Sequence, residues 1–95
     1  MRFLTRFGVI LLLASGLPAA QMSKMYGQIF HQNGRPAANV TITVDDDAAH
    51  QAETNAAGVY SIRVAPGSHA VRIGSTVFKV HIFNKPRNRR DFRIP

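Results

Sequence analysis

Short segments in which apolar and polar residues alternate run through most of this chain. In residues 59–64, for example, Tyr60, Ile62 and Val64 fall on one side of an extended backbone. A period of two residues is typical of a β-strand with one buried face. No segment after residue 20 shows the period of a helix. The pattern predicts seven strands, at residues 24–30, 40–44, 51–54, 59–64, 69–73, 77–83 and 89–94.

The same alternation assigns a face to each apolar side chain. In the first predicted strand, Met25, Gly27 and Ile29 share one face, while Tyr26 and Phe30 lie on the other. The side chains expected to point into the core are Val40, Ile42, Val44, Tyr60, Ile62, Val64, Val71, Ile73, Phe78, Val80, Ile82, Phe92 and Ile94.

Gly, Pro and Asn separate the predicted strands at short, regular intervals. Turns are expected at residues 32–34, 55–58 and 74–75, because Asn and Gly accept a positive φ at low cost. Pro66 and Gly67 match the central pair of a type II turn. Strands and turns in this arrangement predict an all-β fold, a seven-stranded antiparallel Greek-key β-sandwich of two packed sheets. A small closed barrel is the alternative.

The N-terminal residues have a different pattern, which is that of a secretory signal peptide. Arg2 and Arg6 give a basic start, residues 8–14 are apolar, and residues 15–20 are small residues with one proline. We therefore expect a helical signal peptide at residues 1–20, with an uncertain cleavage point, and one domain at residues 21–95. A retained membrane anchor is the alternative, but the apolar run is shorter than the ~20 residues that span a bilayer.

The sequence contains no cysteine, so neither a disulfide nor a lipid-bearing cysteine is expected. A disulfide-free product with an export signal fits the periplasm of a bacterium, Gram-negative by this interpretation, or secretion from it. Removing residues 1–20 leaves ten basic residues against five acidic ones, a net charge of about +5.

Much of this positive charge is concentrated near the C-terminus, where only Asp91 opposes it. Such a group favours an anionic glycan, a lipid headgroup or an acidic protein surface, since Arg engages carboxylate or phosphate with two hydrogen bonds. Nucleic acid is not expected for an exported protein. The alternative role is a solubilising strand edge. The candidate ligand-binding residues are Lys85, Arg87, Arg89, Arg90 and Arg93, and the candidate interaction surface is Tyr26, Phe30 and Phe83.

One ordered set of residues forms a motif with structural tasks, such as the tight turns at Gly34 and Gly58 and the buried ring of Tyr60. Its positions are Gly27, Ile29, Gly34, Pro36, Ala38, Val40, Ile42, the run from Thr54 to Ile62, Pro66 and Gly67. This set resembles the motif of a known family, the carboxypeptidase regulatory-like domain, a prealbumin-like (transthyretin-like) β-sandwich. The resemblance implies an exported, stand-alone accessory module, and some related sandwiches bind polysaccharide.

Catalytic chemistry is not expected from this sequence. The related hydroxyisourate hydrolases end in Tyr-Arg-Gly-Ser, whereas residues 91–95 here read Asp-Phe-Arg-Ile-Pro. Ser61, Ser68 and Ser75 lie in ordinary strand and turn positions, without an activating base at a suitable spacing.

Related pilus and adhesin domains form an isopeptide bond between a lysine and an asparagine or aspartate. Lys24 is placed as such a lysine would be, with Asn84, Asn88 or Asp91 as its partner, but Arg63 and its neighbour stand where the required buried acid would be. The expected role of Lys24 is that of a solvated residue at the start of a strand.

No metal or other cofactor is expected. Residues 45–47 are three consecutive aspartates, and adjacent side chains on an extended chain point in alternate directions and seldom converge on Ca²⁺. The four histidines, at positions 31, 50, 69 and 81, lack the close spacing of a zinc site.

The sequence thus predicts a non-catalytic, exported binding or structural module of the cell envelope that acts through protein interaction. The alternative is binding of a carbohydrate or another anionic ligand through the C-terminal Arg group.

Overall fold

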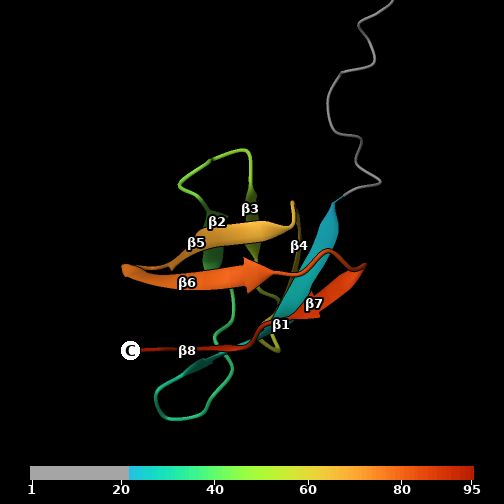
Figure 1. Cartoon of the computed structure of the whole chain (residues 1–95). Coiled ribbons are helices and arrows are strands. Elements are labelled where there is room, and N and C mark those ends of the chain that lie inside the picture. Colours follow the sequence, from blue (N-terminus) through green and yellow to red (C-terminus); the bar gives the residue numbers. More distant parts are fainter. Residues whose placement is uncertain (1–21) are drawn as a thin grey trace, which may run out of the picture.

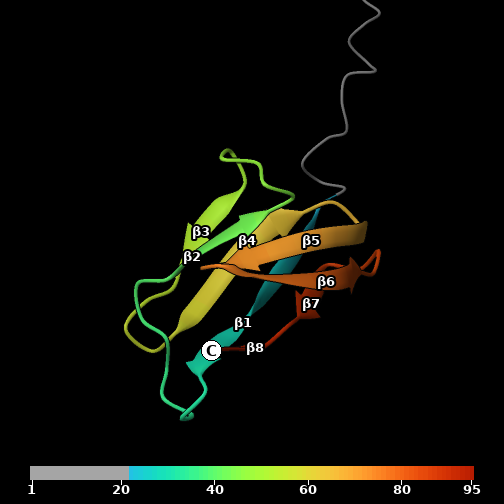
Figure 2. The same cartoon turned by 90° about the vertical axis from the view of Figure 1, so that its left-hand side faces the viewer.

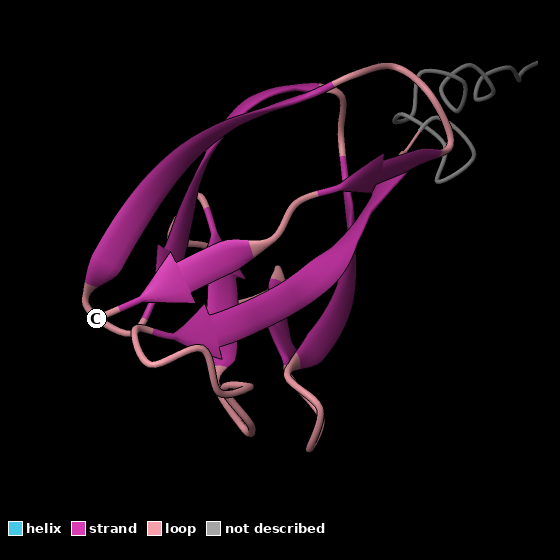
Figure 3. Ribbon diagram, turned by 90° about the horizontal axis from the view of Figure 1, so that it is seen from below, coloured by secondary structure: helices cyan, strands magenta, loops and turns pink. Residues whose placement is uncertain are grey.

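Two β-sheets packed face to face make up the described part of the chain (Figures 1 and 2). The structure is a computed structural model and describes residues 22–95, so the predicted signal peptide at residues 1–20 lies outside the described residues. Within residues 22–95 there are only strands and loops, as Figure 3 shows. The strands are β1 (Ser23–His31), β2 (Thr41–Val44), β3 (Gln51–Glu53), β4 (Val59–Val64), β5 (Gly67–Ile73), β6 (Thr76–Ile82), β7 (Arg87–Arg89) and β8 (Phe92–Ile94). The predicted all-β, two-sheet fold is confirmed.

The first sheet has the order β4-β1-β7, with β8 also paired to β1, and the second has the order β3-β2-β5-β6. Two details of the predicted topology were wrong. The last strand is interrupted at Arg90 and Asp91, which gives eight strands instead of seven. Both pieces, β7 and β8, pair with β1 in parallel, whereas the other pairs are antiparallel as predicted.

Gly27 explains why the last strand is interrupted. At this position in β1 the chain between β7 and β8 crosses very close to the β1 backbone: Arg90 N–H donates to the Tyr26 carbonyl at 2.8 Å, and Gln28 N–H donates to Asp91 Oδ1 at 2.8 Å. A Cβ at Gly27 would overlap the Arg90 carbonyl oxygen and would lie 2.7 Å from Asp91 Oδ1. Glycine is the one residue that leaves this space open.

The core lies between the sheets and follows the predicted alternation. Each side chain predicted to point inward is buried or packs against the buried cluster. Phe92 of β8 links the layers, because its ring centroid lies 4.8 Å from that of Phe78 in β6 and 6.1 Å from that of Tyr60 in β4. Aromatic pairs at such separations add stability beyond their buried area. The C-terminal strand is therefore part of the core.

The predicted turns are present, with one change. Gly34, Gly58 and Gly74 have φ values of 86°, 76° and 63°, as turns there require. Gly67 also has a positive φ, 123°, but it is already the first residue of β5 and pairs with Ile82 of β6. The strand therefore begins two residues before the predicted start at residue 69.

Candidate functional site

Polar side chains of the motif between Gly27 and Gly67 make hydrogen bonds that hold the fold together. Thr54 is buried, and its hydroxyl donates to the Ala37 carbonyl at 2.6 Å and accepts from Val40 N–H at 2.9 Å. The Asn55 carboxamide oxygen accepts from the N–H groups of Ala57 and Val59 and so holds the turn before β4. These polar atoms already have partners, so a binding site has to be sought elsewhere on the molecule.

Positive side chains gather on the outer face of the first sheet. In the strand register, Lys24 of β1 lies between Arg63 of β4 and Arg87 of β7. One step further along β1, Tyr26 lies beside Arg89 of β7. The alternation that buries Met25 directs all of these side chains away from the core. We call Lys24, Tyr26, Arg63, Arg87 and Arg89 the basic face.

The basic face has little compensating negative charge. Among the described residues, the ion pairs include none to Lys24, Arg63 or Arg87, and only Arg89 reaches a carboxylate, with Nε 3.2 Å from Asp91 Oδ2. Like charges directly opposite each other in a sheet are destabilising. A row of three cations across neighbouring strands is therefore kept at some cost, and an anion bound there would relieve it.

Tyr26 holds part of this face in position. The guanidinium carbons of Arg87 and Arg89 lie 5.1 and 6.0 Å from the centroid of its ring. Such cation–π contacts restrict the two long side chains and do not themselves use the guanidinium N–H groups, of which Arg89 Nε–H already donates to Asp91. The ring itself is half-buried.

The structure separates the five basic residues that are grouped near the C-terminus in the sequence. Arg87 and Arg89 lie on the basic face. Arg90 is half-buried and donates to the carbonyls of Arg89 and His81 at 2.7 and 2.6 Å, so it ties the first sheet to β6. Arg93 donates to the carbonyl of Gln32 at 3.1 Å, and Lys85 is exposed in the loop between β6 and β7.

Sequence reasoning missed Lys24 and Arg63 as members of a basic face. A signal was available, because alternation places both residues outward on their strands. What the sequence did not show is that β4 and β7 pair with β1 on opposite sides, in a register that aligns Arg63, Lys24 and Arg87.

The three candidate aromatic residues lie on two different segments, and Phe83 packs against His81 and Arg90. Tyr26 and Phe30 both lie outward on β1, and Phe30 is in register with Arg93. Phe83 follows β6, is 55% exposed, and packs edge-on against His81, with ring centroids 4.9 Å apart. Its other partner is the Arg90 guanidinium, 5.8 Å from the ring centroid.

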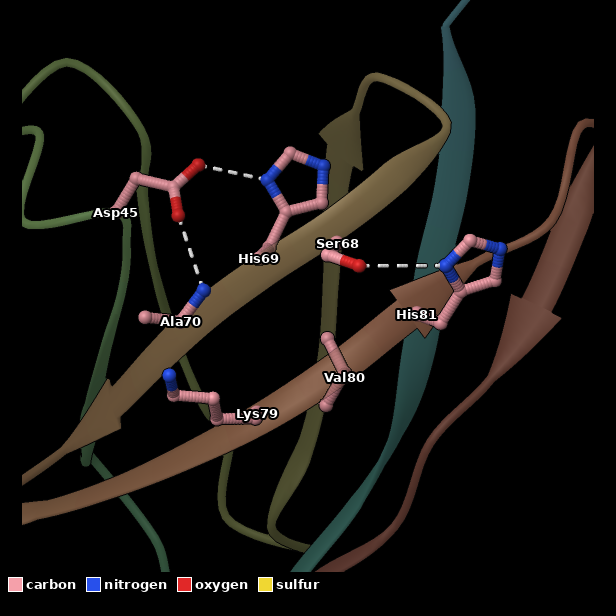
Figure 4. A pocket seen from close by; sticks show the side chains of 7 residues that line it. All are labelled: Asp45, Ser68, His69, Ala70, Lys79, Val80 and His81. Carbon is pink, nitrogen blue, oxygen red and sulfur yellow. Dashed lines mark hydrogen bonds and ion pairs between the residues drawn. The ribbon is translucent and has the colours of Figure 1, made fainter.

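A shallow hollow of about 430 Å³ lies over β5 and β6 on the second sheet (Figure 4). Its polar lining comes from Asp45, Ser68, His69, Lys79 and His81. Ser68 Oγ and His81 Nδ1 are 3.5 Å apart, and both side chains are exposed. A serine nucleophile needs a closer base that a third group orients, and neither condition is met at His81.

His69 is the most constrained side chain of this hollow. Its Nδ1 lies 2.6 Å from Asp45 Oδ2, and its Nε2 lies 2.7 Å from the Ala65 carbonyl oxygen. Both partners are acceptors, so both ring nitrogens donate only when the ring is protonated. His69 thereby joins the end of β2 to the connection between the two sheets.

These contacts determine the protonation of the pair. Burial by itself lowers the pKa of His69, but the hydrogen bonds to Asp45 and Ala65 outweigh it, and the pKa lies above its usual value. The Ala70 N–H and the His69 ring hold the pKa of Asp45 below its usual range. Both shifts favour the charged forms, so they extend the pH range over which the two residues form an ion pair.

The His69 bonds predict a pH dependence of stability. Because the folded pKa is raised, the contribution is fully present below the ordinary His pKa of about 6.5 and is lost as pH rises through the folded pKa. Asp45 stays ionised throughout this window, since its pKa is lowered. Urea unfolding at about pH 6 and about pH 8.5 should show a larger loss of stability in the wild type than in His69→Gln. Equal losses in the two proteins would show that His69 is not responsible.

The carboxylates at residues 45–47 do not converge. Asp46 pairs with Arg72, with 2.9 Å between Oδ1 and Nε, and Asp47 accepts from Ala49 N–H and faces His50. In the described part of the chain, no group of acidic, His or Cys side chains is arranged to hold a metal ion.

The geometry around Lys24 also does not favour an isopeptide bond to Asn88. Lys24 points outward, whereas Asn88 is buried beneath the same sheet. The Asn88 carboxamide pairs with both backbone groups of Phe83, accepting from N–H at 3.0 Å and donating to the carbonyl at 3.1 Å. It acts as a substitute for a strand neighbour at the end of β6.

The described residues thus define a small two-sheet β-sandwich with an open, charged face. The family model of the carboxypeptidase regulatory-like domain matches residues 24–86, and the chain belongs to this family. Membership indicates a non-catalytic β-sandwich module. The match ends just before β7, so the arginines at 87, 89, 90 and 93 lie outside the matched residues.

Among solved structures, the crystal structure of a 9R-lipoxygenase from Cyanothece PCC8801 is similar to this chain, with a TM-score of 0.52 and 14% sequence identity. The similarity covers 95% of this chain and 18% of that chain. At this identity the likeness shows the fold alone. A comparison with curated proteins found no match. The described residues also contain no helix with the length and hydrophobicity that a membrane crossing needs.

Proposed function

We propose that this protein is a non-catalytic binding module that holds an anionic polysaccharide on its basic face. The observation that carries the proposal is the cross-strand row of Arg63, Lys24 and Arg87, three exposed cations that stand side by side and form no ion pair with any acid in residues 22–95. Sulfate and carboxylate groups are the natural partners of such a row, because Arg binds them with two parallel hydrogen bonds.

The shape of the face supports an extended ligand. Small-molecule sites are concave and enclose most of the ligand. The basic face is the outer surface of a sheet, and the hollow described above is lined by none of its residues. Neighbouring strands lie about 4.8 Å apart, so a row across three strands presents positive charge over roughly 10 Å. A polymer with repeated negative charges fits this better than a compact anion.

The proposed setting is the cell envelope or its exterior. The basic, apolar and small-residue order in residues 1–20 supports export, and a polyanionic glycan is a partner that an exported protein meets. Protein interaction, the other candidate function, is supported by a different part of the surface, which is considered in the next subsection.

The proposal is tested with heparin as the polyanion. The Arg63→Ser/Arg87→Ser variant should bind heparin roughly tenfold more weakly than the wild type, because two exposed charge contacts are lost. The matched control is Arg35→Ser/Lys79→Ser, which removes the same charge from exposed positions off the basic face and should retain most of the affinity. Equal weakening in the two variants would reduce the effect to net charge and overturn the proposed site.

Two further binding experiments test the charge mechanism and distinguish a polysaccharide from a lipid headgroup. Binding by the wild type should weaken steeply as salt is added, since exposed charges are screened beyond ~8 Å at physiological ionic strength. Vesicles with anionic phospholipid headgroups serve as the comparison surface. Tight binding to the vesicles with little affinity for heparin would point to a lipid headgroup and contradict the polysaccharide.

A further inference from the structure

Strand β6 forms an edge of the second sheet, and its outer side has no strand partner among the described residues. We propose that this edge accepts an extended, acidic segment of a partner protein as an added strand. Strand addition is a recurrent mode of peptide recognition, in which main-chain hydrogen bonds supply affinity and alternate side chains supply specificity.

The hydrogen bonds of Ala70 show which backbone groups of β6 are available. Ala70 N–H donates to Asp45 Oδ1 at 2.9 Å, and Asp45 N–H donates to the Ala70 carbonyl at 2.7 Å, so both groups of Ala70 face away from β6. Residues opposite each other in an antiparallel pair exchange both hydrogen bonds or neither. Lys79, the partner of Ala70 in the register, therefore directs its N–H and carbonyl to the free edge.

Val77 and His81 lie two residues before and after Lys79, so their backbone N–H and carbonyl groups also point to the free edge. The His81 carbonyl confirms the assignment, because it accepts from Arg90 Nη2 of the other sheet. Among the described residues, no hydrogen bond outside the strand ladders uses the N–H or carbonyl of Val77 or Lys79, and the register directs these groups away from β5. An added strand would therefore find four backbone groups free, and Arg90 would mark one end of the site.

The side chains along β6 indicate what kind of strand would fit. Phe78 and Val80 pack against the core but are only half-buried, and in the described part of the chain β6 has a strand partner on one side only. Every second residue of an added strand would cover these two side chains and should be apolar. The alternate residues would lie beside Lys79 and His81 on the outer face, close to Arg90, and should be acidic.

Charge also distinguishes a partner protein from a second copy of this chain. Pairing two β6 edges would bring two copies of Lys79 and Arg90 together, and like charges across an interface oppose association. Asp45 lines the same hollow as Lys79, and its carboxylate is already bound to His69 and to Ala70 N–H. An exposed edge lysine can also serve only to prevent aggregation, and this is one outcome of the test.

The test uses a short, labelled synthetic peptide of alternating Glu and Val, with its ends blocked. The peptide should bind the wild type, and amide exchange at Val77 and Lys79 should slow when it is added. A peptide of alternating Lys and Val should bind at least about tenfold more weakly. Lys79→Glu should reverse the preference.

Val77→Pro supplies the backbone control. Proline is tolerated on an edge strand where the missing N–H faced solvent, so the variant should keep its dispersed amide spectrum. It should bind the Glu-Val peptide at least about tenfold more weakly, because proline removes a donor and blocks the added strand. The spectrum of the variant checks that the fold is retained.

Three results would overturn the proposal. The first is peptide binding that Val77→Pro leaves unchanged but Arg63→Ser/Arg87→Ser abolishes, which would place the acidic peptide on the basic face. The second is self-association of the protein through β6. The third is that neither peptide binds, which would mean that Lys79 only prevents aggregation through the β6 edge. Heparin binding is measured separately from all three results, so the two proposals can fail separately.

Discussion

Gly27→Ala is expected to cost this protein most of its stability. The new methyl group would point into the space that the Arg90 carbonyl oxygen occupies, and it would crowd the Asp91 carboxylate. Both belong to the link between β7 and β8, which is held by backbone bonds and cannot move aside alone. Overpacking a core costs about 1–3 kcal/mol. Displaced hydrogen bonds add about 1 kcal/mol each.

The total exceeds about 3 kcal/mol, a large fraction of the stability of a small domain. Chemical denaturation of both proteins measures it. Gly34→Ala is the matched control, since Gly34 also has a positive φ but its missing Cβ would meet nothing within 4 Å. The control should lose only about 1–2 kcal/mol, the cost of a left-handed backbone with a side chain. A Gly27→Ala protein as stable as this control would contradict the crossing at Gly27.

Tyr60→Ala should have an effect of similar size, for a different reason. Tyr60 is one of the largest fully buried side chains, and its ring packs against Phe92 of the C-terminal strand. Truncating such an aromatic residue to alanine costs about 3–5 kcal/mol. The hydroxyl donates to the Arg90 carbonyl at 2.5 Å, and burial raises the pKa of Tyr60, so it remains a donor at neutral pH.

The comparison with Tyr60→Phe separates packing from hydrogen bonding. Phenylalanine keeps the ring and leaves the Arg90 carbonyl without this donor, at a cost of about 1–3 kcal/mol. Urea unfolding should therefore rank the wild type above Tyr60→Phe and Tyr60→Phe above Tyr60→Ala. If the two variants were equally unstable, the hydroxyl rather than the ring would account for the role of Tyr60.

The sequence predicted the layers of this fold better than their connections. Alternation identifies inward residues because a one-residue shift would turn every side chain of a strand outward. It contains no information on strand direction, so the parallel pairing of β7 and β8 with β1 was not predicted. The interruption at Arg90 and Asp91 depends on Gly27, which is more than 60 residues earlier in the chain.

The same limit applies to the candidate site. Five basic residues close together in sequence suggested one binding group, yet Arg90 and Arg93 bind backbone carbonyls of other segments. The basic face instead combines Arg87 and Arg89 with Lys24 and Arg63, which only the strand register brings together. Local composition predicted the charge of the surface, and the pairing of distant strands determines where that charge lies.

The most direct test of the basic face is an NMR titration of isotope-labelled protein with a short heparin oligosaccharide. The expected result is that the largest amide shifts map to the strand segments around Lys24, Arg63 and Arg87, and that they disappear in Arg63→Ser/Arg87→Ser. Shifts confined to the loop at Lys85, or no shifts at saturating oligosaccharide, would contradict an anion-binding face built by the register of β4, β1 and β7.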